Sequence, residues 1–375
     1  MAKLDGLFMH MMKKDASDLH IASGSAPFIR INGDLFQIDM KPLTHEQNFQ
    51  MFNELMDDRN REELERKHQV DFVYAMGDKA RFRANVFLQR RGVSAVFRII
   101  PSKILSAEDL NLPAPIIKLC GLKKGLVLVT GPTGSGKSTT LAAMVDHINR
   151  TRQDHILTIE DPIEFVHRNK KCLVTQRQIG DNVDTFADSL RAALREDPDI
   201  ILVGEMRDLE TISQAITAAE TGHLVFGTLH TTSAPKTVDR VIDAFPTTQQ
   251  EQIRTMLAES LKGVIAQALL KRADRKGRIA AYEILLGTPA LGALIRENKT
   301  FQLPSLIQTQ RAIGMCLMDQ ALVDLVKQSL VEPDEAIVYA QDQKMFQAAV
   351  DRLKAGKTGE QADQTVAPPP DGFGF

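Results

Sequence analysis

Eight consecutive residues near the middle of the chain carry the clearest chemical signal. Residues 131–138 read GPTGSGKS, after an apolar run over Gly125 to Thr130 and before a helical pattern over Thr139 to Asn149. Glycines at these positions let the backbone N–H groups converge on phosphate oxygens at the N-terminus of a helix. We therefore predict a phosphate-binding loop, because an accidental glycine-rich turn does not account for the strand before it and the helix after it.

The same loop predicts a nucleotide and a metal ion. Lys137 would neutralise the β and γ phosphates of ATP, and the Ser138 hydroxyl would join the shell of a bound Mg²⁺. The residues that we expect to bind ATP are Gly131, Thr133, Gly134, Ser135, Gly136, Lys137, Ser138 and Thr139.

Acidic residues follow two further apolar runs, 156–159 and 200–203. In a parallel sheet the carboxyl ends of the strands face the ligand, so these acids would lie near the nucleotide. Hydrolysis needs a carboxylate that positions or deprotonates water and another group that holds Mg²⁺. Our choices are Glu164 and Glu205, with Glu160 and Asp161 as further candidates. The alternative is that these acids only cap the turns that follow.

Two histidines flank the apolar run 224–229. Seven residues of strand separate His223 from His230 by about 23 Å and turn them to opposite faces, so they would not share a metal ion. His230 would end its strand on the ligand side and could sense the γ-phosphate, or it could be a surface histidine; the sequence leaves both open.

Residues 81–98 contain five arginines and no acid. Alternating apolar residues predict two strands, and a two-residue loop at Arg91-Gly92 would pair Leu88 with Ala95. Arg98 would then lie diagonal to Arg83 on the polar face, where a phosphate between them would relieve the repulsion. The alternative is a solvated basic face or an edge that binds RNA.

These residues need a scaffold, and the length of 375 residues indicates two domains or more. Residues 1–100 mix helical and strand signals, which predicts a small α+β domain, and prolines mark a linker over 101–120. Short apolar strands then alternate with helices, which is typical of a parallel α/β sheet. We assign this domain to 121–355, with helices from about residue 288, and expect a disordered tail over 356–375.

Composition excludes several classes of protein. Lys plus Arg is 46 and Asp plus Glu is 48, so the net charge of −2 argues against wholesale nucleic-acid binding. The three cysteines, Cys120, Cys172 and Cys316, form no CxxC pair, so neither a disulfide framework nor a zinc site is expected. No stretch approaches the roughly eighteen consecutive apolar residues that a membrane span needs. We expect a soluble, unexported cytoplasmic protein.

The strings GPTGSGKSTT, TIEDPIEF, DPDIILVGEMRDLET and AAETGHLVFGTLHT, in this order, closely resemble the secretion-ATPase superfamily. Over nearly its whole length the chain is similar to the twitching-motility ATPases of type IV pili. The resemblance implies an N-terminal PAS-like domain, a RecA-like P-loop ATPase domain, and a homo-hexamer on the cytoplasmic side of the inner membrane. It implies ATP and Mg²⁺ as ligands and the pilus platform protein of the inner membrane as a peripheral partner.

The resemblance also implies roles for the candidate residues. Glu160, Asp161 and Glu164 match the aspartate box, with Glu164 as catalytic base, and Glu205 matches the Walker B carboxylate. His223 and His230 match the histidine box, and Arg83 and Arg98 would approach nucleotide phosphates at subunit interfaces.

Two features favour pilus retraction over extension: the absence of a tetracysteine site and the early position of the P-loop. The family's retraction motif AIRNLIRE reads ALGALIRE at 290–297, so glycine and alanine replace its central arginine and asparagine. We expect a short helix that buries Leu291, Leu294 and Ile295 and turns Gly292 to another face, where arginine would be tolerated. Arg296 and Glu297 are then the candidates that couple ATP hydrolysis to movement.

Three other functions stay open. They are an accessory paralogue of the retraction ATPase or another motor of the superfamily, a RecA-like nucleic-acid translocase, and a module that binds nucleotide without hydrolysing it. Only the arginine hairpin favours the translocase, and no aromatic stacking pattern supports it. The four carboxylates argue against a module without catalysis.

Overall fold

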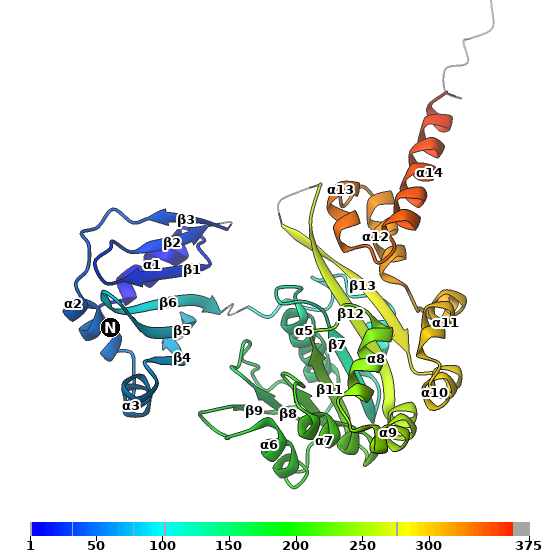
Figure 1. Ribbon diagram of the computed structural model, residues 1–375, viewed down its shortest axis with the longest axis horizontal. Coiled ribbons are helices and arrows are strands. Elements are labelled where there is room, and N and C mark those ends of the chain that lie inside the picture. The colour runs from blue at the N-terminus through cyan, green and yellow to red at the C-terminus, as the bar shows by residue number, and fades with distance from the viewer. Residues whose placement is uncertain (1, 32, 78, 101–102, 275–276, 363–375) are drawn as a thin grey trace, which may run out of the picture. The chain divides into compact units, whose positions relative to one another are not determined.

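The structure is a computed structural model that describes residues 2–31, 33–77, 79–100, 103–274 and 277–362. The chain forms two compact units (Figure 1). The first contains the residues up to Ile104 together with the short segment Pro162–Val166, and the second contains the remainder. The fold class expected from the sequence, α/β with an N-terminal α+β domain, a RecA-like domain and C-terminal helices, is confirmed.

The first unit is built on an antiparallel sheet of six strands in the order β3-β2-β1-β6-β5-β4. Its core is aromatic: the ring of Phe8 stacks on Phe82 at 4.1 Å between centroids and meets Phe97 edge-on at 5.1 Å. The elements are α1 (Asp5–Lys13), β1 (Asp18–Ala22), β2 (Phe28–Ile31), β3 (Asp34–Gln37), α2 (His45–Asn53), α3 (Asp58–Lys67), β4 (Gln69–Met76), β5 (Ala80–Gln89) and β6 (Gly92–Ile100).

The second unit has a sheet of seven strands in the order β13-β12-β7-β11-β10-β8-β9. All neighbouring strands are parallel except β13, which is antiparallel to β12. The strands are β7 (Gly125–Thr130), β8 (His155–Glu160), β9 (Leu173–Gln178), β10 (Ile200–Val203), β11 (Leu224–Leu229), β12 (Leu261–Lys271) and β13 (Arg278–Leu286). The central strands β7, β10 and β11 are buried along their whole length, which explains their continuous apolar runs.

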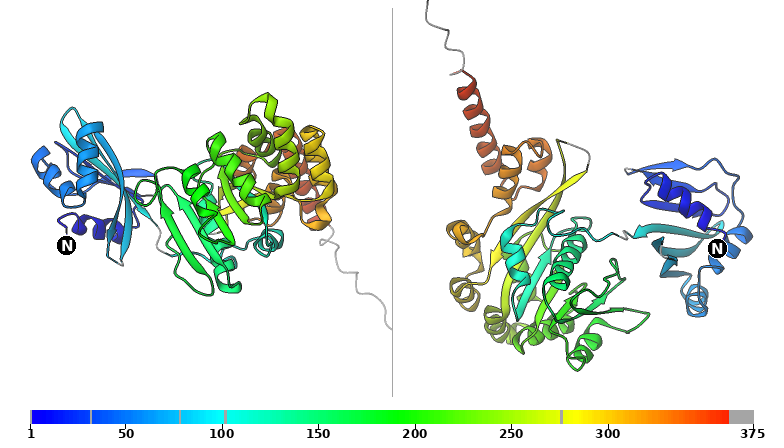
Figure 2. Two further views of the ribbon diagram at one scale, coloured as in Figure 1. Left: turned by 90° about the horizontal axis from the view of Figure 1, so that it is seen from below. Right: turned by 180° about the vertical axis from the view of Figure 1, so that it is seen from behind.

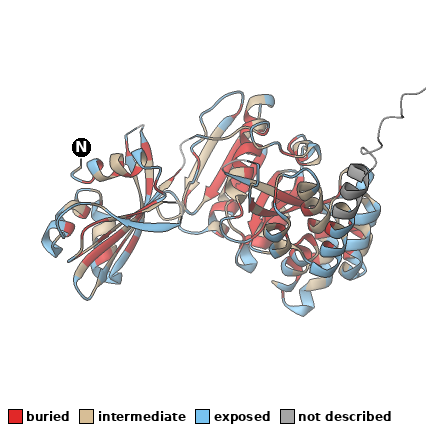
Figure 3. Ribbon diagram, turned by 90° about the horizontal axis from the view of Figure 1, so that it is seen from above, coloured by how far each residue is buried: buried red, intermediate tan, exposed pale blue. Residues whose placement is uncertain are grey.

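Helices cover both faces of this sheet, so each central strand contributes side chains to two hydrophobic cores. Val127 and Val129 pack with α4 (Ala114–Cys120) and α5 (Lys137–Thr151), whereas Leu126 and Leu128 pack with the opposite layer of helices. That layer comprises α6 (Phe186–Ala193), α7 (Leu209–Glu220), α8 (Ala234–Asp243), α9 (Thr247–Ser260) and α10 (Pro289–Arg296). Figure 2 shows the sheet between its helices, and Figure 3 shows its strands as the buried centre of the unit.

The C-terminal helices are α11 (Leu303–Thr309), α12 (Met318–Lys327), α13 (Pro333–Ala336) and α14 (Gln343–Ala362). A buried carboxylate on β13 ties this region to the sheet. Glu283 accepts hydrogen bonds from the backbone N–H of Ala234 at 2.6 Å, the N–H of Met318 at 3.1 Å and the amide of Gln341 at 3.2 Å. Burial raises the pKa of Glu283, and these donors act against that rise.

Three sequence expectations need correction or comment. The range 101–120 contains helix α4, so it is not only a linker. Residues 356–362, expected to be disordered, continue α14, and 363–375 lie outside the described residues. None of the described helices has the length and apolar character to cross a membrane.

Candidate functional site

The loop between β7 and α5 has the backbone geometry of a phosphate cradle. Gly131 and Gly136 adopt φ angles of +144° and +88°, a region that favours glycine. Helix α5 begins at Lys137, directly after Gly136, so the free N–H groups of its first turn face the loop. The positive end of the helix dipole adds to the attraction for an anion.

The side chains that were predicted to bind ATP lie in this loop and in the first turn of α5. The amino group of Lys137 donates to the carbonyl oxygen of Gly131 at 2.7 Å and to that of Pro132 at 3.1 Å. It is therefore held over the loop, where it can neutralise phosphate charge. Ser138 and Thr139 follow it and are half-buried.

Glu205 lies just beyond the end of β10, where it makes an ion pair with Arg207 and a hydrogen bond with His230. Burial alone would raise the pKa of Glu205, but hydrogen bonds and charges from Arg207 and His230 outweigh it and lower the pKa. An ionised carboxylate only accepts hydrogen bonds, so His230 Nε2 donates to Glu205 Oε1 over 2.8 Å. The histidine that was expected to face the ligand thus meets the Walker B candidate.

Glu160 ends β8, the strand that neighbours β10. Its carboxylate accepts from the Thr158 hydroxyl at 2.7 Å and from the Gln176 amide at 3.1 Å. A Cβ on Gly204 would lie 3.2 Å from the Cα of Glu160, so the chain packs tightly against Glu160 where it leaves β10. Asp161 is exposed, and its charge helps to raise the pKa of Arg207. The structure therefore groups Glu160, Asp161 and Glu205 at one edge of the sheet.

Glu164 belongs to the segment Pro162–Val166, which packs with the first unit. Its side chain is exposed, while the neighbouring Phe165 is buried and the Ile163 carbonyl accepts from Arg81 at 3.2 Å. The role of catalytic base stays a prediction for Glu164.

His223 lies at the opposite end of β11 from His230. Its Nδ1 is 3.0 Å from the carbonyl oxygen of Ala218 in the preceding helix. No group of three or more His, Cys, Asp or Glu side chains in the described parts of the chain is placed to hold a metal ion. The Ser138 hydroxyl stays the predicted Mg²⁺ ligand of this chain, and an oxygen ligand suits the preference of Mg²⁺.

The arginine hairpin has a different register from the expected one. Gln89 pairs with Gly92, so Arg90 and Arg91 form the two-residue turn, and Arg98 lies directly opposite Arg83. The same face stays apolar because the register is displaced by an even number of residues. The expected diagonal placement of Arg98 relative to Arg83 is therefore wrong.

Carboxylates from neighbouring strands also accompany these arginines. Arg98 Nε donates to Asp18 at 2.7 Å, and Arg83 lies 3.9 Å from Asp71. Burial opposes ionisation of Asp18, but hydrogen bonds from Ser17 and Arg98 and the charge of Arg98 lower its pKa. An anion is not required to hold these arginines together, and their role at a phosphate stays a prediction.

Helix α10 departs from the expected orientation at one position. Thr288 caps it and Leu291 and Ile295 are buried as expected, but Gly292 is buried too and Leu294 only partly. A Cβ on Gly292 would lie 3.1 Å from the carbonyl oxygen of Ala258 on α9. This close contact between helices argues against the expectation that arginine is tolerated at position 292, which stays a prediction. Arg296 and Glu297 are exposed.

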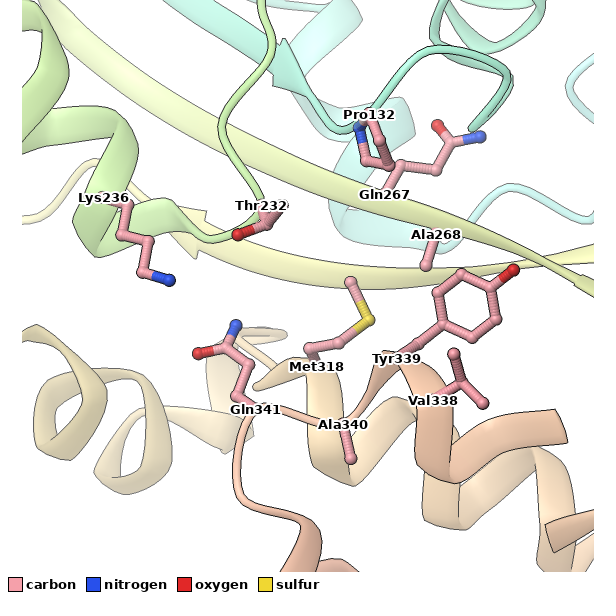
Figure 4. A pocket seen from close by; sticks show the side chains of 10 residues that line it. All are labelled: Pro132, Thr232, Lys236, Gln267, Ala268, Met318, Val338, Tyr339, Ala340 and Gln341. Carbon is pink, nitrogen blue, oxygen red and sulfur yellow. The ribbon is translucent and has the colours of Figure 1, made fainter. Parts of the chain in front are cut away.

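A pocket of about 420 Å³ lies beside the phosphate loop, between β12, the start of α8 and the C-terminal helices (Figure 4). It is lined by Pro132, Thr232, Lys236, Gln267, Ala268, Met318, Val338, Tyr339, Ala340 and Gln341. Sequence reasoning missed Gln267 and Arg207. Arg207 could have been found, because it follows Glu205 by two residues in the sequence GEMRD at 204–208. No spacing or motif in the sequence singles out Gln267.

Several known proteins are similar to this chain in sequence or in fold. The retraction ATPase PilT of Pseudomonas aeruginosa is 54% identical over 324 residues, which cover 86% of this chain and 94% of that protein. A twitching motility protein of Neisseria gonorrhoeae is 54% identical over 316 residues, 84% of each chain. The crystal structure of the pilus retraction motor PilT with bound ADP superposes with a TM-score of 0.86 at 46% identity, covering 92% of this chain and 98% of that one. The family described as type II/IV secretion system protein matches residues 2–357, and this chain belongs to it.

Proposed function

We propose that this chain is an ATP-hydrolysing motor that drives retraction of the type IV pilus and so twitching motility. The observation that carries the proposal is the phosphate loop together with the Glu205–His230 pair at the end of a strand two places away in the same sheet. Similarity to retraction ATPases over nearly the whole chain supports the same function.

In this mechanism the loop and Lys137 hold the β and γ phosphates, and the ionised Glu205 lies near the γ-phosphate. Glu164 accepts a proton from a water molecule while the oxygen of that water attacks the γ-phosphorus. The bond between the γ-phosphorus and the oxygen that bridges the β and γ phosphates breaks, which yields ADP and phosphate. Mg²⁺, when bound through Ser138, offsets charge on the phosphates. His230 senses the γ-phosphate through its hydrogen bond to Glu205.

The motor works as a homo-hexamer beside the inner membrane, on its cytoplasmic side, where it contacts the platform protein of the pilus. In that ring Arg83 and Arg98 approach phosphates at subunit interfaces. ATP turnover per subunit should then rise with protein concentration as the oligomer forms. Full activity in isolated monomers would contradict the interface role.

Two assays test the function. Purified protein should release phosphate from ATP without stimulation by DNA or RNA, because a translocase would be stimulated. Deletion of the gene should leave cells with accumulated pili and no surface motility, and the wild-type gene but not Lys137→Ala should restore motility. Loss of pili after deletion would show that the motor extends the pilus instead.

Arg296 and Glu297 are our candidates for transmitting force to the partner, because both are exposed at the end of α10. The double variant Arg296→Ala with Glu297→Ala should hydrolyse ATP within a few fold of wild type but should not restore motility. Intact twitching in that variant would remove these residues from the coupling role.

A further inference from the structure

Strand β12 carries a buried glutamine whose side chain reaches the phosphate loop. Gln267 is 3% exposed and lies 127 residues from Thr140 in the chain. Its amide nitrogen donates to the carbonyl oxygen of Ser135 at 2.7 Å, and its amide oxygen accepts from the hydroxyl of Thr140 at 2.8 Å. The Ser135 carbonyl only accepts, so these two contacts fix which end of the amide faces the loop.

The backbone and side chain of Gln267 also account for two glycines of the loop. A Cβ on Gly131 would collide with the carbonyl oxygen of Gln267, and a Cβ on Gly136 would lie 2.9 Å from its amide nitrogen. Both ends of the loop therefore pack against one residue. Figure 4 shows Gln267 next to Pro132 at the side of the pocket.

The hydrogen bond to Ser135 has a consequence on the other side of the same peptide. In a planar trans peptide the C=O of one residue and the N–H of the next point in opposite directions. When Gln267 holds the Ser135 carbonyl toward β12, the N–H of Gly136 points away from β12. That N–H precedes Lys137 and belongs to the group that cradles the α and β phosphates in loops of this kind.

We infer that Gln267 is a positioning residue for the nucleotide: it fixes the Ser135–Gly136 peptide so that the Gly136 N–H is aimed at the β-phosphate before binding. The Thr140 hydroxyl orients the amide, and Gln267 itself does not touch the nucleotide. This inference rests on the nucleotide site of the proposed function. Because ADP carries the β-phosphate, MgADP is a sufficient probe.

The experiment compares the MgADP dissociation constants of the full-length wild type and four variants. Gln267→Leu removes both hydrogen bonds with similar bulk and should weaken binding by on the order of tenfold, because one peptide loses its fixed orientation. Thr140→Val should weaken binding by roughly a few fold, because the amide keeps its contact with Ser135. Gln250→Leu is the matched control, because the Gln250 amide donates to the carbonyl oxygen of Phe245 at 3.1 Å and lies on α9, outside the phosphate loop. This variant should bind MgADP as the wild type does.

Gln267→Glu tests the donor to Ser135 directly. Its carboxylate accepts from Thr140 but cannot donate to Ser135, whereas the protonated acid regains a donor. Burial raises the pKa of a carboxyl group, so the ratio of its dissociation constant to that of the wild type should fall from about pH 8 to about pH 6. The Gln267→Leu ratio should stay constant over that range.

Wild-type binding of MgADP by Gln267→Leu would overturn the inference. So would equal weakening in Gln267→Glu and Gln267→Leu at every pH, because the protonated acid regains the donor that leucine lacks. If Gln267→Leu does not fold, the pH dependence of Gln267→Glu decides. Failure of the wild type to bind MgADP would refute the proposed function instead.

Discussion

The phosphate loop and the arginine hairpin differ in where their chemistry comes from. The loop acts mainly through its own backbone, and its key lysine bonds to carbonyls five and six residues away. The arginines of the hairpin act through side chains, and the carboxylate that pairs with Arg98 comes from Asp18, 80 residues earlier. A local motif can therefore be interpreted from sequence alone, whereas the partner of a charged strand residue depends on sheet order and register.

Lys137→Ala tests the local side of this comparison and should have the largest effect. The phosphates lose their fixed counter-charge, so ATP and ADP affinity should fall by on the order of a hundredfold or more. Titration with a fluorescent nucleotide measures it. Normal ATP binding by this variant would refute the assignment of the loop.

Glu205→Gln tests the pair that joins two strand ends. The variant should retain ADP affinity while turnover falls by on the order of 10², because the charge held by Arg207 and His230 is lost. The pKa of Glu205 is already low, so wild-type turnover should not depend on its protonation near neutral pH and should fall only in acid. Wild-type turnover in this variant would show that Glu205 has no catalytic role.

Gly292→Arg tests a contact between helices that the sequence did not reveal. The Cβ of arginine would lie 3.1 Å from the Ala258 carbonyl oxygen on α9, and overpacking of this kind costs about 1–3 kcal/mol. Thermal unfolding of the variant should therefore begin at a lower temperature, while Ala293→Asn at the half-buried neighbour serves as control. An unchanged unfolding temperature would show that α9 and α10 separate easily.

Arg98→Ala should destabilise the first unit because Asp18, whose side chain is only 4% exposed, loses its hydrogen bond and ion pair with Arg98. A hydrogen bond to a charged group contributes about 1.5–3 kcal/mol, and the exposure of Arg98 at 68% places the loss at the lower end. The pKa of Asp18 is lowered in the fold, so this stabilisation is present above its usual pKa and is lost as the pH falls through the lowered value. Denaturant unfolding at neutral and acidic pH measures both.

Arg83→Ala should have the smallest effect. The arginine is 52% exposed and 3.9 Å from an exposed Asp71, and such surface pairs contribute about 0–1 kcal/mol. A loss as large as that of Arg98→Ala would mean that the two arginines act together. A loss of ATP turnover without destabilisation would instead support their predicted role at phosphates.

The sequence predicted the elements better than the contacts between them. Strand periodicity identified β7, β10 and β11 because both of their faces are buried, and the position of Glu205 followed from the end of β10. The hairpin register was wrong because two turns that differ by one residue keep the same face apolar, so periodicity does not choose between them. Gly292 and Gln267 were not predictable, because each is explained by a partner on a distant element.

The three donors that meet Glu283 limit how far this protein can be shortened. Any fragment that stops after β13 would lose Met318 and Gln341. The carboxylate of Glu283 would then keep only the hydrogen bond from Ala234 at the start of α8 and would lose the one from Met318 at the start of α12. Such a fragment would also uncover the apolar surface on which Leu291, Ile295 and Leu303 pack. The helices after β13 thus pack as part of the ATPase domain, so a minimal catalytic fragment should extend at least to Gln341.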